Sequence, residues 1–247
     1  MSISFKTYSI LSFLSISTLI LYAYYTREQF YPTILFLVSS KISFVLSGNM
    51  ALVTAAMVAK LITSLFFGKL RGAEVEILID KAKYSITETC LALTVFRHEI
   101  NTPILLMFAS LIYVKSFHWL GKSRMEYNEQ IQPLPIKAHI RMFSLLFCLI
   151  IIDIGVSVYC IKRTINQGKS VFILFGFEFG LLVINIFILF FRYIIQSMDS
   201  YLETGLSSKG FALMLIDLIG DASKFVTYSF FFCLVFVYYG LPIHIIR

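Results

Sequence analysis

The sequence predicts an all-α, polytopic membrane protein with about seven transmembrane helices and no soluble domain. Its 247 residues are 58% hydrophobic and only 14% charged. A soluble domain has about 25% charged residues. Several charge-free runs are long enough to cross a bilayer, including residues 7–26, 42–59 and 225–244. Composition and run length together exclude an ordinary globular protein.

The first two expected helices have charge-free centres. Residues 3–25 are expected to form an uncleaved first helix, because no small-x-small cleavage site follows the apolar run after Lys6. Residues 33–67 are expected to form the second helix, centred on the apolar run 42–59.

The third expected helix, residues 73–96, differs because charged residues interrupt it. It contains no Gly or Pro, and it is long enough to cross a bilayer. A charge near the bilayer centre costs roughly 2.5–3.5 kcal/mol. We therefore expect this helix to pack one face against other helices and to turn another toward a polar environment, with Glu88 facing protein or water.

The remaining chain predicts four more helices, at residues 101–120, 138–160, 170–196 and 210–239. A polar loop at 121–137, a turn at 162–168 and a polar turn ending at Lys209 are expected to connect them. Pro103 falls in the first turn of its helix, where proline is tolerated. We expect one transmembrane domain over residues 1–247.

The basic residues predict an orientation. The connections at 68–72 and 121–137 contain Lys69, Arg71, Lys122, Arg124 and Lys137. The positive-inside rule therefore favours a cytosolic N-terminus. Three basic residues run against that pattern, namely Lys162, Arg163 and Lys169. The net charge of +7 does not indicate nucleic-acid binding, because the basic residues are dispersed at helix ends, where they contact lipid headgroups.

The cysteines and histidines do not predict a metal site. Cys90, Cys148, Cys160 and Cys233 stand alone in apolar segments, and none forms a CxxC pair. The four histidines are equally scattered. Because a zinc-binding RING domain needs several spaced pairs of Cys and His ligands, these 247 residues predict no RING.

Five of the expected helices carry polar or ionisable side chains inside their apolar segments. These are Glu88, Lys115, His118, Asp153, Glu178, Asn185, Asp217, Asp221 and Lys224. Because such groups are costly in lipid, they are candidates for a shared polar cavity. The alternative is that each group snorkels to an interface or pairs locally, as the i,i+3 spacing of Asp221 and Lys224 allows. Asp153 and Glu178 lie deep, so water or protein must solvate them, or they must hold a proton.

No catalytic motif accompanies these residues. The chain has no HExxH, no GxSxG and no phosphate-binding glycine loop. Asp217 and Asp221 lie one turn apart on one helix, which is a poor geometry for a protease dyad. We therefore expect no catalytic residue, metal or cofactor. Proton-coupled or small-molecule transport stays open, and so does a purely structural assembly subunit whose charges only pair helices.

Three segments resemble the membrane half of the synoviolin family of RING-type ubiquitin ligases. They read FFGKLRGAE at 66–74, TETCLALTVFR at 87–97 and FHWL at 117–120. Shorter matches are YY at 24–25, QFYPT at 29–33 and GFE at 176–178. The family-motif positions that we single out are Phe67, Gly68, Arg71, Glu74, Thr87, Glu88, Arg97, His118 and Trp119.

The resemblance implies an endoplasmic-reticulum membrane protein of endoplasmic-reticulum-associated degradation (ERAD). Its role would be to recognise misfolded proteins and assist their retrotranslocation to the cytosol for ubiquitination. The polar interior would then be a cytosol-facing aqueous cavity.

The partners that the resemblance implies are the lipid bilayer, Derlin-type proteins, a Sel-type repeat adaptor, a RING or ubiquitin-conjugating partner, and misfolded substrates. Self-association is compatible with this picture. Ubiquitin transfer cannot be assigned to these residues, since a RING follows the membrane half in the family. The RING would lie on another polypeptide, be lost from the gene, or lie beyond a truncation.

Overall fold

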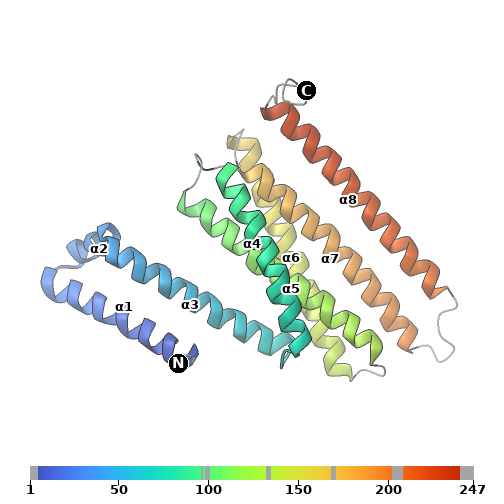
Figure 1. Cartoon of the computed structure of the whole chain (residues 1–247), viewed down its shortest axis with the longest axis horizontal. Helices are drawn as coiled ribbons and strands as arrows, with labels where there is room; N and C mark the ends of the chain where they lie inside the picture. Colours follow the sequence, from blue (N-terminus) through green and yellow to red (C-terminus); the bar gives the residue numbers. More distant parts are fainter. Residues whose placement is uncertain are drawn as a thin grey trace. The chain divides into compact units, whose positions relative to one another are not determined.

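The computed structural model describes residues 5–95, 97, 101–131, 135–167, 171–201 and 208–239, and the regular elements within these ranges are all helices. Figure 1 shows their order along the chain. The eight helices are α1 (Phe5–Arg27), α2 (Phe30–Ser39), α3 (Lys41–Phe66), α4 (Gly72–Val95), α5 (Thr102–Gln130), α6 (Ile136–Gln167), α7 (Phe172–Tyr201) and α8 (Lys209–Tyr239). The expectation of an all-α, multi-span fold is confirmed.

Six of these helices are long and apolar enough to cross a membrane, which is one fewer than the expected seven. The helix that makes the difference is α4. Its 24 residues span about 36 Å at 1.5 Å per residue, so its length suffices. Its charged residues lower its hydropathy, however, and they exclude α4 from the helices that are apolar enough to cross a membrane. The remaining helix, α2, has only 10 residues.

The expected second helix, residues 33–67, is divided into α2 and α3 at Ser40. Ser40 has an extended backbone, with φ −77° and ψ 127°, and its N–H donates to Phe36 O at 2.9 Å. The Ser40 carbonyl accepts a hydrogen bond from Phe44 N–H, so this residue ends one helix and begins the next. Consecutive serines at 39 and 40 favour such a break, because their side chains compete with the helix for backbone groups.

Two expected connections are helical in the structure. The loop expected at 121–137 is α5 as far as Gln130, because residues 122–130 are mostly strong helix formers and contain no Gly or Pro. The turn expected at 162–168 is α6 as far as Gln167, and Gly168 lies outside the described residues. Helix length was therefore underestimated wherever polar residues extend a spanning helix.

The chain forms two compact units, residues 1–68 and 69–247. In the first unit, α1 packs against α2 and α3 (Figure 1). A polar contact joins the two long helices: the Asn49 amide donates to Ser12 Oγ at 3.0 Å, and the Tyr8 hydroxyl donates to Asn49 Oδ1. Gly68 ends this unit with φ 69°, a left-handed conformation that glycine adopts at little cost. The expectation of a single transmembrane domain stays a prediction.

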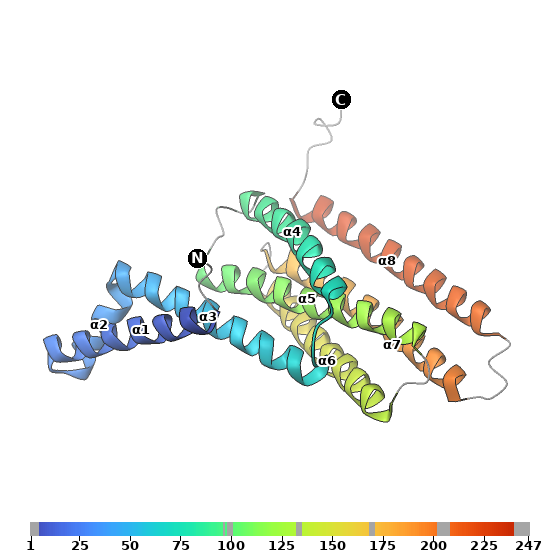
Figure 2. The ribbon, with the colours of Figure 1, turned by 60° about the horizontal axis from the view of Figure 1, so that its bottom comes forward.

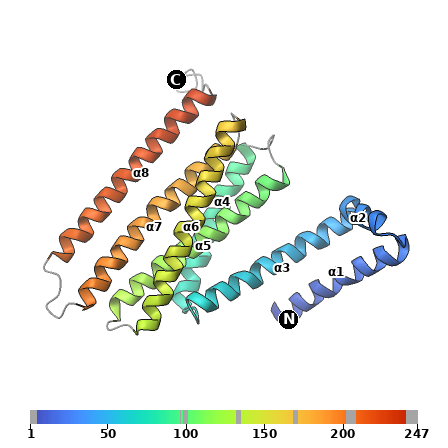
Figure 3. The same ribbon diagram turned by 180° about the vertical axis from the view of Figure 1, so that it is seen from behind.

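In the second unit, α6 and α7 pack side by side and α8 packs on α7, as Figures 2 and 3 show from two further directions. α5 contacts α4, α6 and α7. The core of the unit lies between α5, α6 and α7, where Phe108 and Phe175 meet edge to face and Leu146 and Ile186 are fully buried. This packing places four helices, α4, α5, α7 and α8, around a group of polar side chains.

Candidate functional site

A buried pair joins α5 to α6. His118 Nε2 lies 2.7 Å from Asp153 Oδ2, and the Asp153 side chain is fully buried. One proton lies between the two side chains, because one of them must act as the donor at this distance. Asp153 Oδ1 has no hydrogen-bond partner among the described residues. The pair therefore satisfies only part of the carboxylate's hydrogen-bonding capacity.

A second group of charges connects α5 with α7 and α4. Lys115 Nζ lies 2.8 Å from Glu178 Oε2 and 3.6 Å from Glu88 Oε2. Lys115 and Glu178 are largely buried, whereas the Glu88 side chain is 65% exposed. The ammonium thus compensates mainly Glu178, the carboxylate that has lost most of its hydration.

Besides the Lys209–Asp199 pair at its start, two ion pairs among the described residues involve α8. Arg192 of α7 lies 3.2 Å from Asp217, and Lys224 lies 3.1 Å from Asp221 on the same helix. The second pair has the i,i+3 geometry that the sequence allows. Its carboxylate is 76% exposed, so the pair contributes little to stability.

A clamp fixes the start of α4 against the end of α5. Arg124 Nε and Nη2 each lie 2.8 Å from one oxygen of Glu74, whose side chain is buried. Glu74 also accepts the Arg71 backbone N–H at 2.9 Å, which is one half of a capping box at the helix N-terminus. The Arg71 guanidinium lies 3.3 Å from the centre of the Tyr127 ring. Two family-motif residues, Arg71 and Glu74, thus hold α4 in place.

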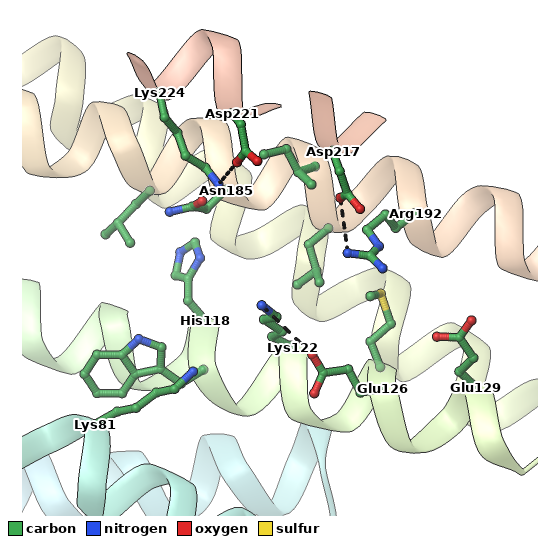
Figure 4. Close-up of a pocket in the computed structure, with 15 residues that line it drawn as sticks. Lys81, His118, Lys122, Glu126, Glu129, Asn185, Arg192, Asp217, Asp221 and Lys224 are labelled. Atoms are coloured by element: carbon green, nitrogen blue, oxygen red, sulfur yellow. Dashed lines mark hydrogen bonds and ion pairs between the residues drawn. The ribbon is translucent and has the colours of Figure 1, made fainter. Parts of the chain in front are cut away.

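Two cavities lie along this set of charges. The larger, of about 480 Å³, is bounded by α4, α5, α7 and α8, and Figure 4 shows its polar side chains converging from these helices. The smaller, of about 440 Å³, is lined by Glu88, Lys115 and Glu178 among others. Lys81, Trp119, Leu182 and Asn185 line both. We call the two cavities together the polar cleft.

The formal charges of the larger cavity cancel. Its ionisable lining, apart from His118, consists of four cations and four carboxylates: Lys81, Lys122, Arg192, Lys224, Glu126, Glu129, Asp217 and Asp221. In the smaller cavity two cations, Lys81 and Lys115, face two carboxylates, Glu88 and Glu178. The polar cleft therefore offers charged and hydrogen-bonding groups of both signs without a net field that selects one sign.

The residues expected to form a polar cavity do not all line it. Glu88, Glu178, Asn185, Asp217, Asp221 and Lys224 line the polar cleft. Asp153 lines neither cavity, because it lies behind His118 in a packed contact. Among the family-motif residues, Glu88, His118 and Trp119 line the cleft. Thr87 donates to the Lys83 carbonyl of its own helix, and Phe67 and Gly68 belong to the first unit. Arg97 is exposed, and residues 96 and 98–100 beside it lie outside the described residues.

Several lining residues were not expected. Arg192 interrupts the apolar run of α7, so the rule that selected Asp153 would have found it. Lys122, Glu126 and Glu129 fall in the loop expected at 121–137, although Lys122 and Glu126 have the i,i+4 spacing of a helical ion pair. Lys81 is one of the charged residues that interrupt the third expected helix.

The comparisons with known proteins agree with the resemblance. A family model described as "E3 ubiquitin-protein ligase synoviolin-like, TPR repeats" matches residues 4–247. The ERAD-associated E3 ubiquitin-protein ligase hrd1 of Schizosaccharomyces pombe is 26% identical over 246 residues, which cover 98% of this chain and 36% of that relative. The chain thus spans about a third of the length of the curated relative. Because the family match extends over nearly all of its residues, the chain belongs to the synoviolin-like family.

Proposed function

We propose that this chain is the membrane-embedded module of an ERAD ubiquitin-ligase complex, and that the polar cleft contacts misfolded polypeptides on their way to ubiquitination. The observation that carries the proposal is the charge-balanced cleft within an otherwise apolar helical unit. The family membership and the name of the fission-yeast relative support the biological setting.

A cleft of this composition suits an unfolded chain. A polypeptide in transit exposes backbone amides and side chains of both charges, each of which is costly to place in lipid. Asn185 and Trp119 offer hydrogen bonds to such groups from the wall shared by both cavities. Because most wall charges already pair with a counter-charge in the cleft, contacts with a passing chain would be weak and reversible.

The charge balance weighs against the transporter alternative. A carrier for an anionic or cationic solute concentrates it with a net field of opposite sign. The larger cavity has four formal charges of each sign, so no such field arises from its lining. A carrier for a neutral solute would be compatible with this lining, and the experiment below distinguishes it from the proposal.

The proposed orientation determines which side of the membrane the cleft faces. With a cytosolic N-terminus and seven crossings, including α4, the end of α5 near Glu129 faces the cytosol, and the larger cavity opens toward that side. We propose an endoplasmic-reticulum location, with Derlin-type and Sel-type repeat proteins and a RING or ubiquitin-conjugating enzyme as partners. Ubiquitin transfer would be supplied by that partner or by a RING segment.

Site-specific photo-crosslinking tests the cleft. A photoreactive residue at Asn185, which lines both cavities, is compared with one at Phe191, which lies on the same helix, is half exposed and lines neither. Both proteins are expressed with a misfolded secretory protein, and the proteasome is inhibited. We expect adducts with the misfolded protein from position 185 and few from position 191.

The contrary outcomes are specific. Equal adducts from both positions would show that the substrate meets the lipid-facing surface instead of the cleft. No adduct from either position, in a complex that still contains ubiquitin-ligase partners after detergent extraction, would support the structural-subunit alternative. Absence of those partners, together with uptake of a neutral solute in proteoliposomes, would support transport.

A further inference from the structure

An apolar groove lies at the other end of the second unit, away from the larger cavity. It has a volume of about 360 Å³ and is lined by the end of α6, the start of α7 and the second half of α8. Its lining includes Ile161, Ile173, Gly176, Phe177, Thr227 and Phe231. The volume lies within the range of about 300–1,000 Å³ that is typical of small-molecule sites.

Two cations stand beside this groove without a matching carboxylate. Lys162 and Arg163 are exposed, and no acidic residue lies within salt-bridge distance of either among the described residues. The sequence contains no Asp or Glu between Asp153 and Glu178, and none after Asp221. This end of α6, α7 and α8 therefore has uncompensated positive charge, unlike the polar cleft.

Arg163 is held at the rim of the groove by aromatic rings. Its guanidinium lies 5.8 Å from the centres of the Tyr159 and Phe172 rings, and its Nε donates to the Tyr159 hydroxyl at 3.2 Å. Phe172 itself lines the groove. The remaining guanidinium N–H groups have the fork geometry that binds phosphate oxygens in pairs.

The same cations break the charge pattern of the chain. With the proposed cytosolic N-terminus, the end of α6 faces the opposite side of the membrane, where the positive-inside rule expects few basic residues. A local anionic partner would explain this exception, because each Lys or Arg near an anionic surface contributes to lipid attraction.

We propose that the groove binds an acyl chain of a phospholipid with an anionic headgroup, and that Lys162 and Arg163 bind its phosphate. The acyl chain fills a groove that faces the hydrocarbon region, while the headgroup lies at the helix end, where the two cations are. The groove borders the smaller cavity of the polar cleft, with which it shares Phe177, but the proposal does not rest on the proposed function.

Native mass spectrometry tests the site on the full chain in micelles. The micelles contain equal amounts of phosphatidylserine and phosphatidylcholine with the same acyl chains. We expect wild-type protein to retain phosphatidylserine preferentially. The double variant Lys162→Gln/Arg163→Gln should lose that preference by about fivefold for each cation removed, which is the fold-change equivalent to roughly 1 kcal/mol.

Matched variants separate the headgroup from the groove. Lys41→Gln, which removes an exposed cation in the first unit, should leave retention unchanged, and Arg163→Lys should keep most of it. Thr227→Phe fills the groove and should reduce retention of both lipids, whereas Val226→Phe, on the same helix but outside the groove, should not.

Three results would overturn the proposal. The first is equal retention of the two lipids by the wild-type protein. The second is unchanged phosphatidylserine preference in the double variant. The third is full lipid retention by Thr227→Phe, which would show a headgroup contact that does not use the groove. Gel filtration and circular dichroism of each variant test whether the helices remain folded. A loss of lipid retention in a folded variant can then be assigned to the site.

Discussion

The His118–Asp153 pair allows a prediction of the coupling free energy between two residues of the second unit. We consider three variants: His118→Leu, Asp153→Val and the double replacement. Each substitution is close in volume to the original residue, so the changes act mainly on the polar contact. The pair lies between two spanning helices, and its carboxylate is fully buried.

The two single variants should differ in cost. His118→Leu leaves the Asp153 carboxylate buried without its partner, and breaking a buried charged pair in this way costs roughly 3–5 kcal/mol. Asp153→Val leaves only an imidazole without its partner, and His118 lines the larger cavity, where water can reach it. For that loss we expect about 1–2 kcal/mol.

The double variant should be less damaging than His118→Leu alone. Replacing both partners with apolar groups of similar shape is nearly neutral apart from repacking, which costs less than about 1.5 kcal/mol. The single variants together would cost about 4–7 kcal/mol on these estimates. The coupling free energy should therefore be at least about 2 kcal/mol.

The assay is reversible unfolding in mixed micelles, with a titration of dodecyl sulfate monitored by circular dichroism. The exposed pair Asp221–Lys224 supplies the control, since its coupling should be below about 0.5 kcal/mol. Additive costs at His118 and Asp153 would refute the argument. So would a cost for His118→Leu no larger than that for Asp221→Val.

Two further predictions concern packing and topology. A Cβ at Gly220 would overlap both Cδ1 and Cγ1 of Ile188, so Gly220→Ala should cost about 1–3 kcal/mol in thermal unfolding. Ile188→Val should recover part of that loss, and an equal loss in Gly180→Ala, where a Cβ meets nothing within 4 Å, would contradict the reasoning. For topology, a glycosylation acceptor inserted between Gln130 and Ile136 should stay unmodified and one inserted after Glu28 should be glycosylated. The opposite pattern would show that the N-terminus is lumenal.

Hydropathy predicted the spanning helices because it sums a property of each residue over its neighbours in the chain. Five apolar helices were expected near their observed positions, and α4 was identified as the charged exception. The break at Ser40 and the continuation of α5 to Gln130 were missed. Both depend on local competition between side chain and backbone hydrogen bonds, which an apolar run does not reveal.

Eight of the nine polar side chains singled out from the sequence line the polar cleft, but their partners on other helices could not be predicted. The Asp221–Lys224 pair was foreseen because both members lie on one helix, where spacing determines proximity. Asp153 was expected to meet water or protein, and only the fold shows that His118 is its partner, 35 residues away. Arg192 and Lys122 joined the cleft because α7 and α5 turn those faces toward α8.

The sequence by itself determined that this chain is a helical membrane protein of the synoviolin-like family with charges inside its apolar segments. The tertiary structure alone decided which charges pair, that the two cavities have balanced charge, and that Lys162 and Arg163 stand beside an apolar groove. The physical reason is the distance along the chain over which each property is set. Helix formation and membrane partition depend on neighbouring residues, whereas a contact between helices depends on their rotation and axial shift, which the packing of many side chains sets together.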